Sequence, residues 1–239
     1  PDALKTCLKN LKEQFSSHKV SLVFGCGGNR DKNKRAKMGK IADLYSDKIY
    51  LTDDNPRLEQ ASKIRKDIKK GIKNQNVLEL ANREKAISKA IKDLNTGEIL
   101  LVAGKGHETT QEIGRKKIFS SDKKIILNAI KTKNLTLSNN LKANIINELS
   151  GEKKISPKAF LKQGRINSQE VNKKDIFFAI KGKKNDGNKF ISEAFKKKAS
   201  IAIVKTINKN YKKKHQVKFN YTLKLLTKTS KIDKQERNA

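Results

Sequence analysis

Apolar positions in the first half of the chain follow helical spacing in some stretches and strand spacing in others. Within residues 2–15, Leu4, Leu8 and Leu11 recur at intervals of three and four residues, which predicts an amphipathic helix. Residues 20–24 form a short continuous apolar run, which predicts a buried strand. The chain therefore opens with a helix followed by a strand.

This alternation continues to residue 130. The pattern predicts further helices over residues 35–45, 61–72, 83–94 and 123–130, and further strands over residues 48–51, 77–80 and 98–102. Ser121 and Asp122 stand where they would cap the last of these helices. Strands that alternate with helices favour a parallel sheet covered on both faces, so we expect an α/β fold with a Rossmann-like, mostly parallel, three-layer domain over residues 1–133.

The pattern changes after residue 133. Residues 134–140 are polar and predict a turn between two domains. Beyond that turn the spacing predicts helices over residues 141–149 and 188–198 and strands over residues 175–180 and 200–204. A smaller α/β domain is therefore expected over residues 134–239, with a frayed, lysine-rich end from residue 231.

Three predicted strands run into loops that could bind a ligand. They are the glycine-rich loop at 25–28, the loop at 53–57 and the glycine-rich loop at 104–108. Ligands bind at the carboxyl ends of parallel strands, so Arg30 and the two later loops are expected to converge on one rim. A cationic cluster that includes Arg30 and Arg35 follows the first loop, at a helix N-terminus where anions are favoured.

The side chains of these loops suit a ligand with carboxylate and ammonium groups. Arg57 can hold a carboxylate through two hydrogen bonds, Asn55 can both donate and accept, and Glu108 can hold an ammonium. Two structural alternatives stay open. The glycines at 25–28 suit a plain strand-to-helix turn, and Asn55 with Pro56 suits an ordinary Asx-Pro turn. We assign no role to His107.

The net charge of +32 also suggests nucleic-acid binding. Only eight of the 56 basic residues are arginine, the residue favoured for bidentate phosphate and base contacts, and the lysines are spread along the whole chain. Specific nucleic-acid binding is therefore not expected. The alternative to a ligand-binding enzyme domain is a basic protein that binds nucleic acid or an anionic surface without enzymatic activity.

Membrane insertion and cysteine chemistry are not indicated by the sequence. No apolar run approaches the length of a membrane span, and the first residues lack the apolar core of a signal peptide, so we expect a cytoplasmic location and no membrane partner. Cys7 and Cys26 have neither the number nor the spacing of a disulfide framework or a zinc site. We expect reduced thiols and no bound metal.

Four motifs of the first domain, taken in order, resemble one enzyme family. They are Val-Phe-Gly-Cys-Gly-Gly-Asn-Arg-Asp-Lys at 23–32, Thr-Asp-Asp-Asn-Pro-Arg at 52–57, Leu-Val-Ala-Gly-Lys-Gly-His-Glu at 101–108 and Ser-Asp at 121–122. Over residues 1 to about 130 the chain resembles the C-terminal, amino-acid-binding domain of the Mur ligases. These enzymes build the peptidoglycan precursor in the bacterial cytoplasm and use ATP.

The resemblance implies a substrate. In this family the Asp-Asn-Pro-Arg motif, here Asp54 to Arg57, marks ligases that add meso-diaminopimelate to the UDP-MurNAc-dipeptide UDP-MurNAc-L-Ala-D-Glu. It implies that meso-diaminopimelate contacts seven residues of this chain: Arg30, Asp54, Asn55, Pro56, Arg57, Gly104 and Glu108. Asn29 departs from the family pattern, which commonly has Asp there.

Residues 141–204 resemble a different domain of the same family. The motifs Asp-Ile-Phe-Phe-Ala-Ile-Lys-Gly at 175–182 and Asp-Gly at 186–187 are similar to the N-terminal, UDP-sugar-binding domain of the ligase that adds D-alanyl-D-alanine. The family commonly has Asp-Ser-Arg where this chain has Gln163-Gly164-Arg165. Nucleotide binding by this half is therefore expected to be weak or absent.

No Gly-x-x-x-x-Gly-Lys-Ser/Thr loop occurs in the sequence. In the Mur ligases ATP and Mg are bound mainly by a central domain, to which this chain shows no resemblance. We therefore expect no catalytic residue here and no turnover by this chain alone. The resemblance suggests a fragment of a fused pair of ligases or the product of a broken reading frame.

Overall fold

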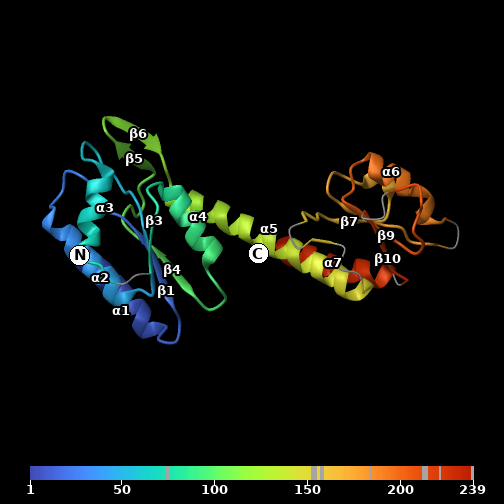
Figure 1. Ribbon diagram of the computed structural model, residues 1–239, viewed down its shortest axis with the longest axis horizontal. Helices are drawn as coiled ribbons and strands as arrows, with labels where there is room; N and C mark the ends of the chain where they lie inside the picture. The colour runs from blue at the N-terminus through green and yellow to red at the C-terminus, as the bar shows by residue number, and fades with distance from the viewer. Residues whose placement is uncertain are drawn as a thin grey trace. The chain divides into compact units, whose positions relative to one another are not determined.

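The computed structural model of the protein describes residues 1–73, 76–151, 155–156, 159–182, 185–211, 215–220 and 222–237. The chain divides into two compact units, Pro1–Lys133 and Asn134–Ala239. Each unit has its own parallel sheet (Figure 1). None of the helices within the described ranges is long and apolar enough to cross a membrane.

The first unit alternates strands and helices, as its apolar pattern predicts (Figure 1). Its helices are α1 (Asp2–Gln14), α2 (Asn33–Tyr45), α3 (Ala61–Lys69), α4 (Arg83–Asp93) and the first part of α5 (Asp122–Ser150). Its strands are β1 (Val20–Phe24), β2 (Lys48–Leu51), β3 (Val77–Glu79), β4 (Ile99–Val102), β5 (Thr110–Ile113) and β6 (Lys116–Phe119). Apart from α5, the elements predicted for this half are present with ends shifted by a few residues.

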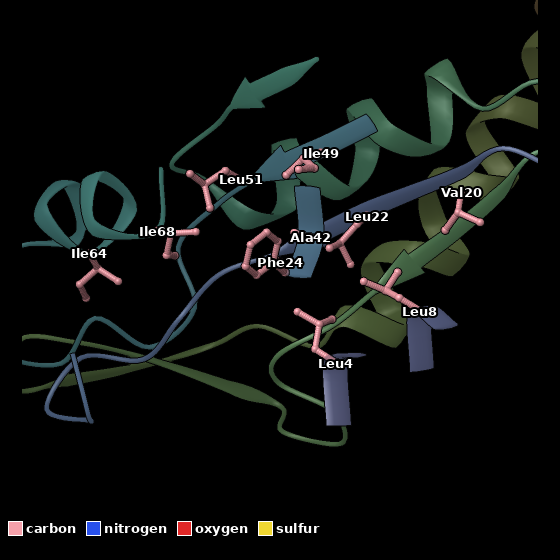
Figure 2. Close-up of a cluster of buried hydrophobic side chains, with 10 residues drawn as sticks. All are labelled: Leu4, Leu8, Val20, Leu22, Phe24, Ala42, Ile49, Leu51, Ile64 and Ile68. Atoms are coloured by element: carbon pink, nitrogen blue, oxygen red, sulfur yellow. The ribbon is translucent and has the colours of Figure 1, made fainter. Parts of the chain in front are cut away.

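The main sheet of the first unit is parallel, with the strand order β3-β2-β1-β4. Successive side chains of a strand point to opposite faces, so Leu22 and Phe24 of β1 face one way while Val23 faces the other. The first face packs against α1, α2 and α3 through Leu4, Leu8, Val20, Leu22, Phe24, Ala42, Ile49, Leu51, Ile64 and Ile68 (Figure 2). Side chains of α4 and α5 cover the other face around Val23 and Tyr50. The predicted Rossmann-like three-layer α/β fold is confirmed.

A hairpin follows β4 that the apolar pattern did not predict. Strands β5 and β6 pair antiparallel around Gly114 and Arg115, and Gly114 has a φ of 61°. The side chains of β6 are all exposed, so no buried apolar face marks this strand in the sequence. A glycine that opens a two-residue loop between two short runs is typical of hairpin turns, and this signal could have identified it.

Helix α5 contradicts the turn that we predicted at residues 134–140. It runs without a break from Asp122 to Ser150 and includes both helices predicted on either side of that turn. No Gly or Pro occurs within this range, so nothing in it stops helix propagation. The predicted turn is therefore wrong. Asn and Ser are tolerated inside a helix whose two ends each contribute apolar side chains to a core.

The second unit also holds a four-stranded parallel sheet, in the order β10-β9-β8-β7. Its strands are β7 (Gly164–Arg165), β8 (Ile176–Phe178), β9 (Ile201–Val204) and β10 (Gln216–Lys218). Its helices are the second part of α5, the short 3-10 helices η1 (Ser168–Glu170) and η2 (Gly187–Phe190), α6 (Ile191–Lys196) and α7 (Thr222–Arg237). The pattern predicted β8 and β9, and it predicted one helix where η2 and α6 lie, but β7, β10 and α7 were missed.

The frayed end that we predicted from residue 231 is wrong as far as Arg237, because α7 continues to that residue. Leu225 and Ile232 of α7 are buried, and this packing compensates for a thin apolar pattern. Residues 238 and 239 lie outside the described part of the chain.

Candidate functional site

The loops that follow β1, β2 and β4 meet at the carboxyl edge of the first sheet. The Gly28 amide donates to the carbonyl oxygen of Asn55 at 2.8 Å. The Asn55 side-chain amide donates to Glu108 Oε2 at 2.7 Å, and Arg57 Nη1 donates to the Gly28 carbonyl at 3.0 Å. The structure thus brings together three loops that the strand order placed on one rim.

Two glycines allow this close approach. A Cβ atom on Gly28 would lie 1.9 Å from the carbonyl oxygen of Pro56, which no side chain could tolerate. A Cβ atom on Gly104 would lie 2.4 Å from Asp54 Oδ2, and Gly104 also has a φ of 116°. Glycine is therefore required at both positions for the loops to touch.

Asn55 joins the second loop to both of its neighbours. Its side-chain oxygen accepts from the backbone amide of Glu112 at 2.9 Å, while its amide nitrogen donates to Glu108. The Asn55 side chain is itself nearly fully buried, so both bonds are at least partly removed from water. Asn55 donates and accepts as predicted, but in this structure its partners are protein groups.

Arg57 makes more bonds within the protein than the sequence predicted. Its backbone has a φ of 50° and is held by the hairpin strand β5, where its amide donates to the Glu112 carbonyl at 3.0 Å. Its Nε pairs with the Glu112 carboxylate at 3.0 Å, and Nη1 contacts two backbone carbonyls. Only Nη2 makes no bond with the described residues, so a carboxylate would meet one terminal nitrogen instead of the predicted pair.

Arg30 and Glu108 carry the exposed charges of the rim. Both side chains are solvent-exposed, and Arg30 makes no hydrogen bond or ion pair with any residue that the structure describes. His107 is exposed as well. A Cβ atom on Gly27 would lie 3.7 Å from both Arg30 Cγ and the Asn55 carbonyl oxygen, and Glu108 accepts from Asn55, so a cation and an anion border the same buried residue. Such a pair is complementary to a group with one carboxylate and one ammonium.

Asp54 and Lys105 lie buried beneath this surface. Burial raises the pKa of the Asp54 carboxyl above its ordinary value, and the nearby Arg83 guanidinium opposes that shift. Burial lowers the pKa of Lys105, whose ammonium donates to the Ser120 carbonyl. These groups support the rim from within, and Pro56, also buried, lies above Gly28.

Sequence reasoning missed the role of Arg83. This buried side chain pairs with Asp122 through Nε at 2.8 Å and Nη2 at 2.7 Å, and Nη2 also donates to the Ala103 carbonyl at 3.0 Å. Asp122 therefore forms a buried ion pair in place of the predicted helix cap. Ser121 does accept from the Lys124 amide, at 3.4 Å. The pair fixes the residue that precedes the 104–108 loop.

Arg35 does not belong to an exposed cationic cluster. Its side chain is 1% exposed and pairs with Glu59 at 2.9 Å and with Asp67 at 3.3 Å. The anion-binding cluster predicted after the first loop is thus wrong for this residue, because the helix turns it inward while Arg30 points outward. Among the described residues no three His, Cys, Asp or Glu side chains gather in a way that could hold a metal ion.

In the second unit, Gln163 and Arg165 line a cavity of about 650 Å³. Arg165 donates to Gln163 Oε1 at 2.9 Å and to Asp175 Oδ2 at 3.4 Å. The guanidinium of the Gln163-Gly164-Arg165 motif is therefore bonded to the buried carboxylate of Asp175.

Comparison with known proteins finds a family model that matches most of the first unit. Residues 1–106 match the family model of the Mur ligase, glutamate ligase domain. The site loops after β1 and β2 and the first part of the loop after β4 lie within that match.

Two similar proteins and a solved structure carry the same name. The chain is 50% identical over 132 residues to UDP-N-acetylmuramoyl-L-alanyl-D-glutamate--2,6-diaminopimelate ligase of Rickettsia rickettsii, which covers 55% of this chain and 28% of that protein. The ligase of the same name from Wigglesworthia glossinidia brevipalpis is 51% identical over 131 residues, with 54% and 26% covered. A solved structure of a ligase of that name is 38% identical, with a TM-score of 0.53 and coverage of 56% and 28%. The chain thus spans 26% to 28% of the length of these relatives.

Proposed function

We propose that the first unit is the amino-acid-binding domain of an ATP-dependent ligase that adds meso-diaminopimelate to UDP-MurNAc-L-Ala-D-Glu. The observation that carries this proposal is the hydrogen bond between Asn55 and Glu108 at 2.7 Å. It holds the Asp-Asn-Pro-Arg loop against the loop that supplies an exposed carboxylate. Relatives that share this half of the chain are named as diaminopimelate ligases, which supports the same substrate.

The charges of the rim match the far end of meso-diaminopimelate. That end bears a carboxylate and an ammonium, whereas the lysine side chain ends in an ammonium alone. Glu108 would attract the ammonium of either compound, but Arg30 and Nη2 of Arg57 would attract only the extra carboxylate. Discrimination between the two amino acids would therefore rest on the arginines.

ATP and Mg do not fit the described residues of this chain. The sequence lacks the glycine-rich loop with Gly-Lys-Ser/Thr that cradles a triphosphate, and no described cluster of carboxylates could hold the metal. This chain would therefore supply the amino-acid site, and none of its described residues would take part in phosphoryl transfer.

We also propose that the second unit corresponds to the UDP-sugar-binding domain of the ligase for the following step. The sequence motifs at 175–182 and 186–187 support this assignment. The bonds of Arg165 to Gln163 and Asp175 favour weak nucleotide binding, because the guanidinium would first have to leave these partners.

The first proposal is tested by titrating the whole chain with meso-diaminopimelate and, separately, with lysine, and by monitoring binding with NMR. Saturable binding of meso-diaminopimelate, tighter than that of lysine, is expected. Arg30→Ala should weaken meso-diaminopimelate binding about 10- to 100-fold, since a charge-assisted hydrogen bond contributes about 1.5 to 3 kcal/mol. It should leave lysine binding nearly unchanged.

Lys92→Ala is the matched control for the loss of one positive charge. Lys92 is exposed in the last turn of α4, which lies at the amino edge of the sheet, away from the rim. Its Kd for meso-diaminopimelate should equal that of the parent. Absence of saturable binding by the parent chain, or an equal effect of both variants, contradicts the proposed function.

A further inference from the structure

The position of Arg30 depends on its backbone, because its exposed side chain contacts no described hydrogen-bonding partner. The residue before it, Asn29, has a φ of 53°. This left-handed conformation is uncommon for a residue with a side chain and persists only where surrounding contacts hold it. A contact must therefore hold the backbone of Asn29 if the side chain of Arg30 is to keep a fixed direction.

Glu59 supplies that contact. Its Oε1 accepts the backbone amide of Asn29 at 2.6 Å, across 30 residues of chain. Glu59 follows the Asp-Asn-Pro-Arg loop by two residues, so this bond links the loop that carries Arg30 to the loop that carries Asn55 and Arg57. A second bond between the same loops, from Gly28 to Asn55, lies just before it.

Arg35 in turn fixes Glu59. Its Nη2 donates to both carboxylate oxygens of Glu59, at 2.9 and 3.0 Å, and its own side chain is buried in the first turn of α2. The hydrogen bond from Arg35 and that from the Asn29 amide hold the pKa of Glu59 below its ordinary value, so both bonds favour the ionised carboxylate. An ionised acceptor binds an amide more strongly than a neutral one.

Asn29 suits this arrangement by its own chemistry. Asn enters the left-handed region more readily than most residues with a side chain. Because it is neutral, it adds no second negative charge beside Glu59, as an Asp at this position would.

We propose that Glu59 is a positioning residue that fixes Arg30 for recognition of the substrate carboxylate. It acts by holding the Asn29 backbone and is itself held by Arg35. This inference rests on the proposed function, because it assigns to Glu59 a part in the selection of meso-diaminopimelate over lysine.

The test is a pair of substitutions of the two acids that bind Arg35. Glu59→Gln weakens the acceptor of the Asn29 amide. Asp67→Asn removes the second carboxylate that pairs with Arg35, 3.3 Å from its Nη1, and leaves the contact of Asn29 unchanged. Glu59→Gln should raise the Kd for meso-diaminopimelate about 3- to 10-fold and leave that for lysine unchanged. Asp67→Asn should lower the melting temperature with a Kd within about twofold of the parent.

A double-mutant cycle with Arg30→Ala separates positioning from a general structural role. If Glu59 acts through Arg30, Glu59→Gln should change the Kd by less than about twofold when Arg30 is already absent. An equal loss in both backgrounds, or equal losses for Glu59→Gln and Asp67→Asn, overturns the inference.

Should Glu59→Gln not fold, Glu59→Asp serves in its place. The shorter carboxylate keeps its charge for Arg35 but cannot reach the Asn29 amide as well, so the Kd for meso-diaminopimelate should again rise. An unchanged Kd overturns the inference. A parent chain that binds no meso-diaminopimelate refutes the proposed function itself, whereas binding that is sensitive to Arg30→Ala and insensitive to Glu59 refutes only the positioning role.

Discussion

Arg57 contacts three different parts of the site through one guanidinium. Its Nε pairs with Glu112 of the hairpin, and its Nη1 reaches the carbonyls of Gly28 and Asn55. Such a planar fork holds several fixed acceptors at once, which a single ammonium cannot do. The residue therefore stabilises the rim, and its Nη2 is left for the carboxylate of the proposed ligand.

Arg57→Lys should impair both roles. We expect a loss of about 1 to 2 kcal/mol in the free energy of unfolding, from the hydrogen bonds that lysine cannot reproduce, and a Kd for meso-diaminopimelate raised about 10-fold or more. Urea unfolding and NMR titration would measure the two effects.

Arg115→Lys is the matched control, since Arg115 is exposed in the hairpin turn and contacts no described partner. It should leave both quantities at the values of the parent. A stable Arg57→Lys variant that still prefers meso-diaminopimelate over lysine as strongly as the parent would mean that the loop is only an Asx-Pro turn.

At the scale of elements, the site depends on how closely the loop after β1 approaches the loop after β2. Gly28 sets this approach, because any Cβ there would overlap the carbonyl of Pro56. Hydrogen bonds of Gly28, Asn29 and Arg57 also join the two loops. A change at Gly28 should therefore move Arg30 away from Asn55.

Gly28→Ala should cost about 1 to 3 kcal/mol in the free energy of unfolding, which is typical of overpacking in a well-packed region. It should also abolish measurable discrimination between meso-diaminopimelate and lysine. Gly182→Ala in the second unit is a fair comparison, because its nearest contact would be 3.5 Å away, an ordinary van der Waals distance. Equal stabilities for the two alanine variants would contradict the close contact at Gly28.

At the scale of the whole molecule, the net charge of +32 makes some attraction to polyanions unavoidable. Attraction of this kind comes from released counterions and falls steeply with salt. Recognition of a zwitterionic amino acid by a few fixed groups depends far less on ionic strength.

Two titrations at low and at physiological salt distinguish these modes. Binding of single-stranded RNA, followed by fluorescence anisotropy, should weaken by orders of magnitude as salt rises, while the Kd for meso-diaminopimelate should change little. RNA binding that survives physiological salt with a preference for one sequence would favour the alternative of a nucleic-acid-binding protein.

The secondary structure of the first unit could be predicted because each buried face has a clear period. Leu4 and Leu8 on a helix, or the continuous run from Val20 to Phe24, mark burial directly in the sequence. Parallel strands also place their following loops at one edge, so the meeting of Asn55 with Glu108 followed from strand order. Where the apolar pattern was thin, as in β6 and α7, the prediction failed.

By itself, the sequence determined the three-layer α/β fold of the first unit and the three loops at its rim. Only the tertiary structure decided which charged residues of these loops face solvent and which are buried. Arg30 and Arg35 are five residues apart and identical in chemistry, yet one is exposed and the other is buried between Glu59 and Asp67. Likewise Arg83 finds Asp122 across 39 residues. Local spacing cannot encode such partners, because an ion pair depends on which elements pack together and not on how far apart they lie along the chain.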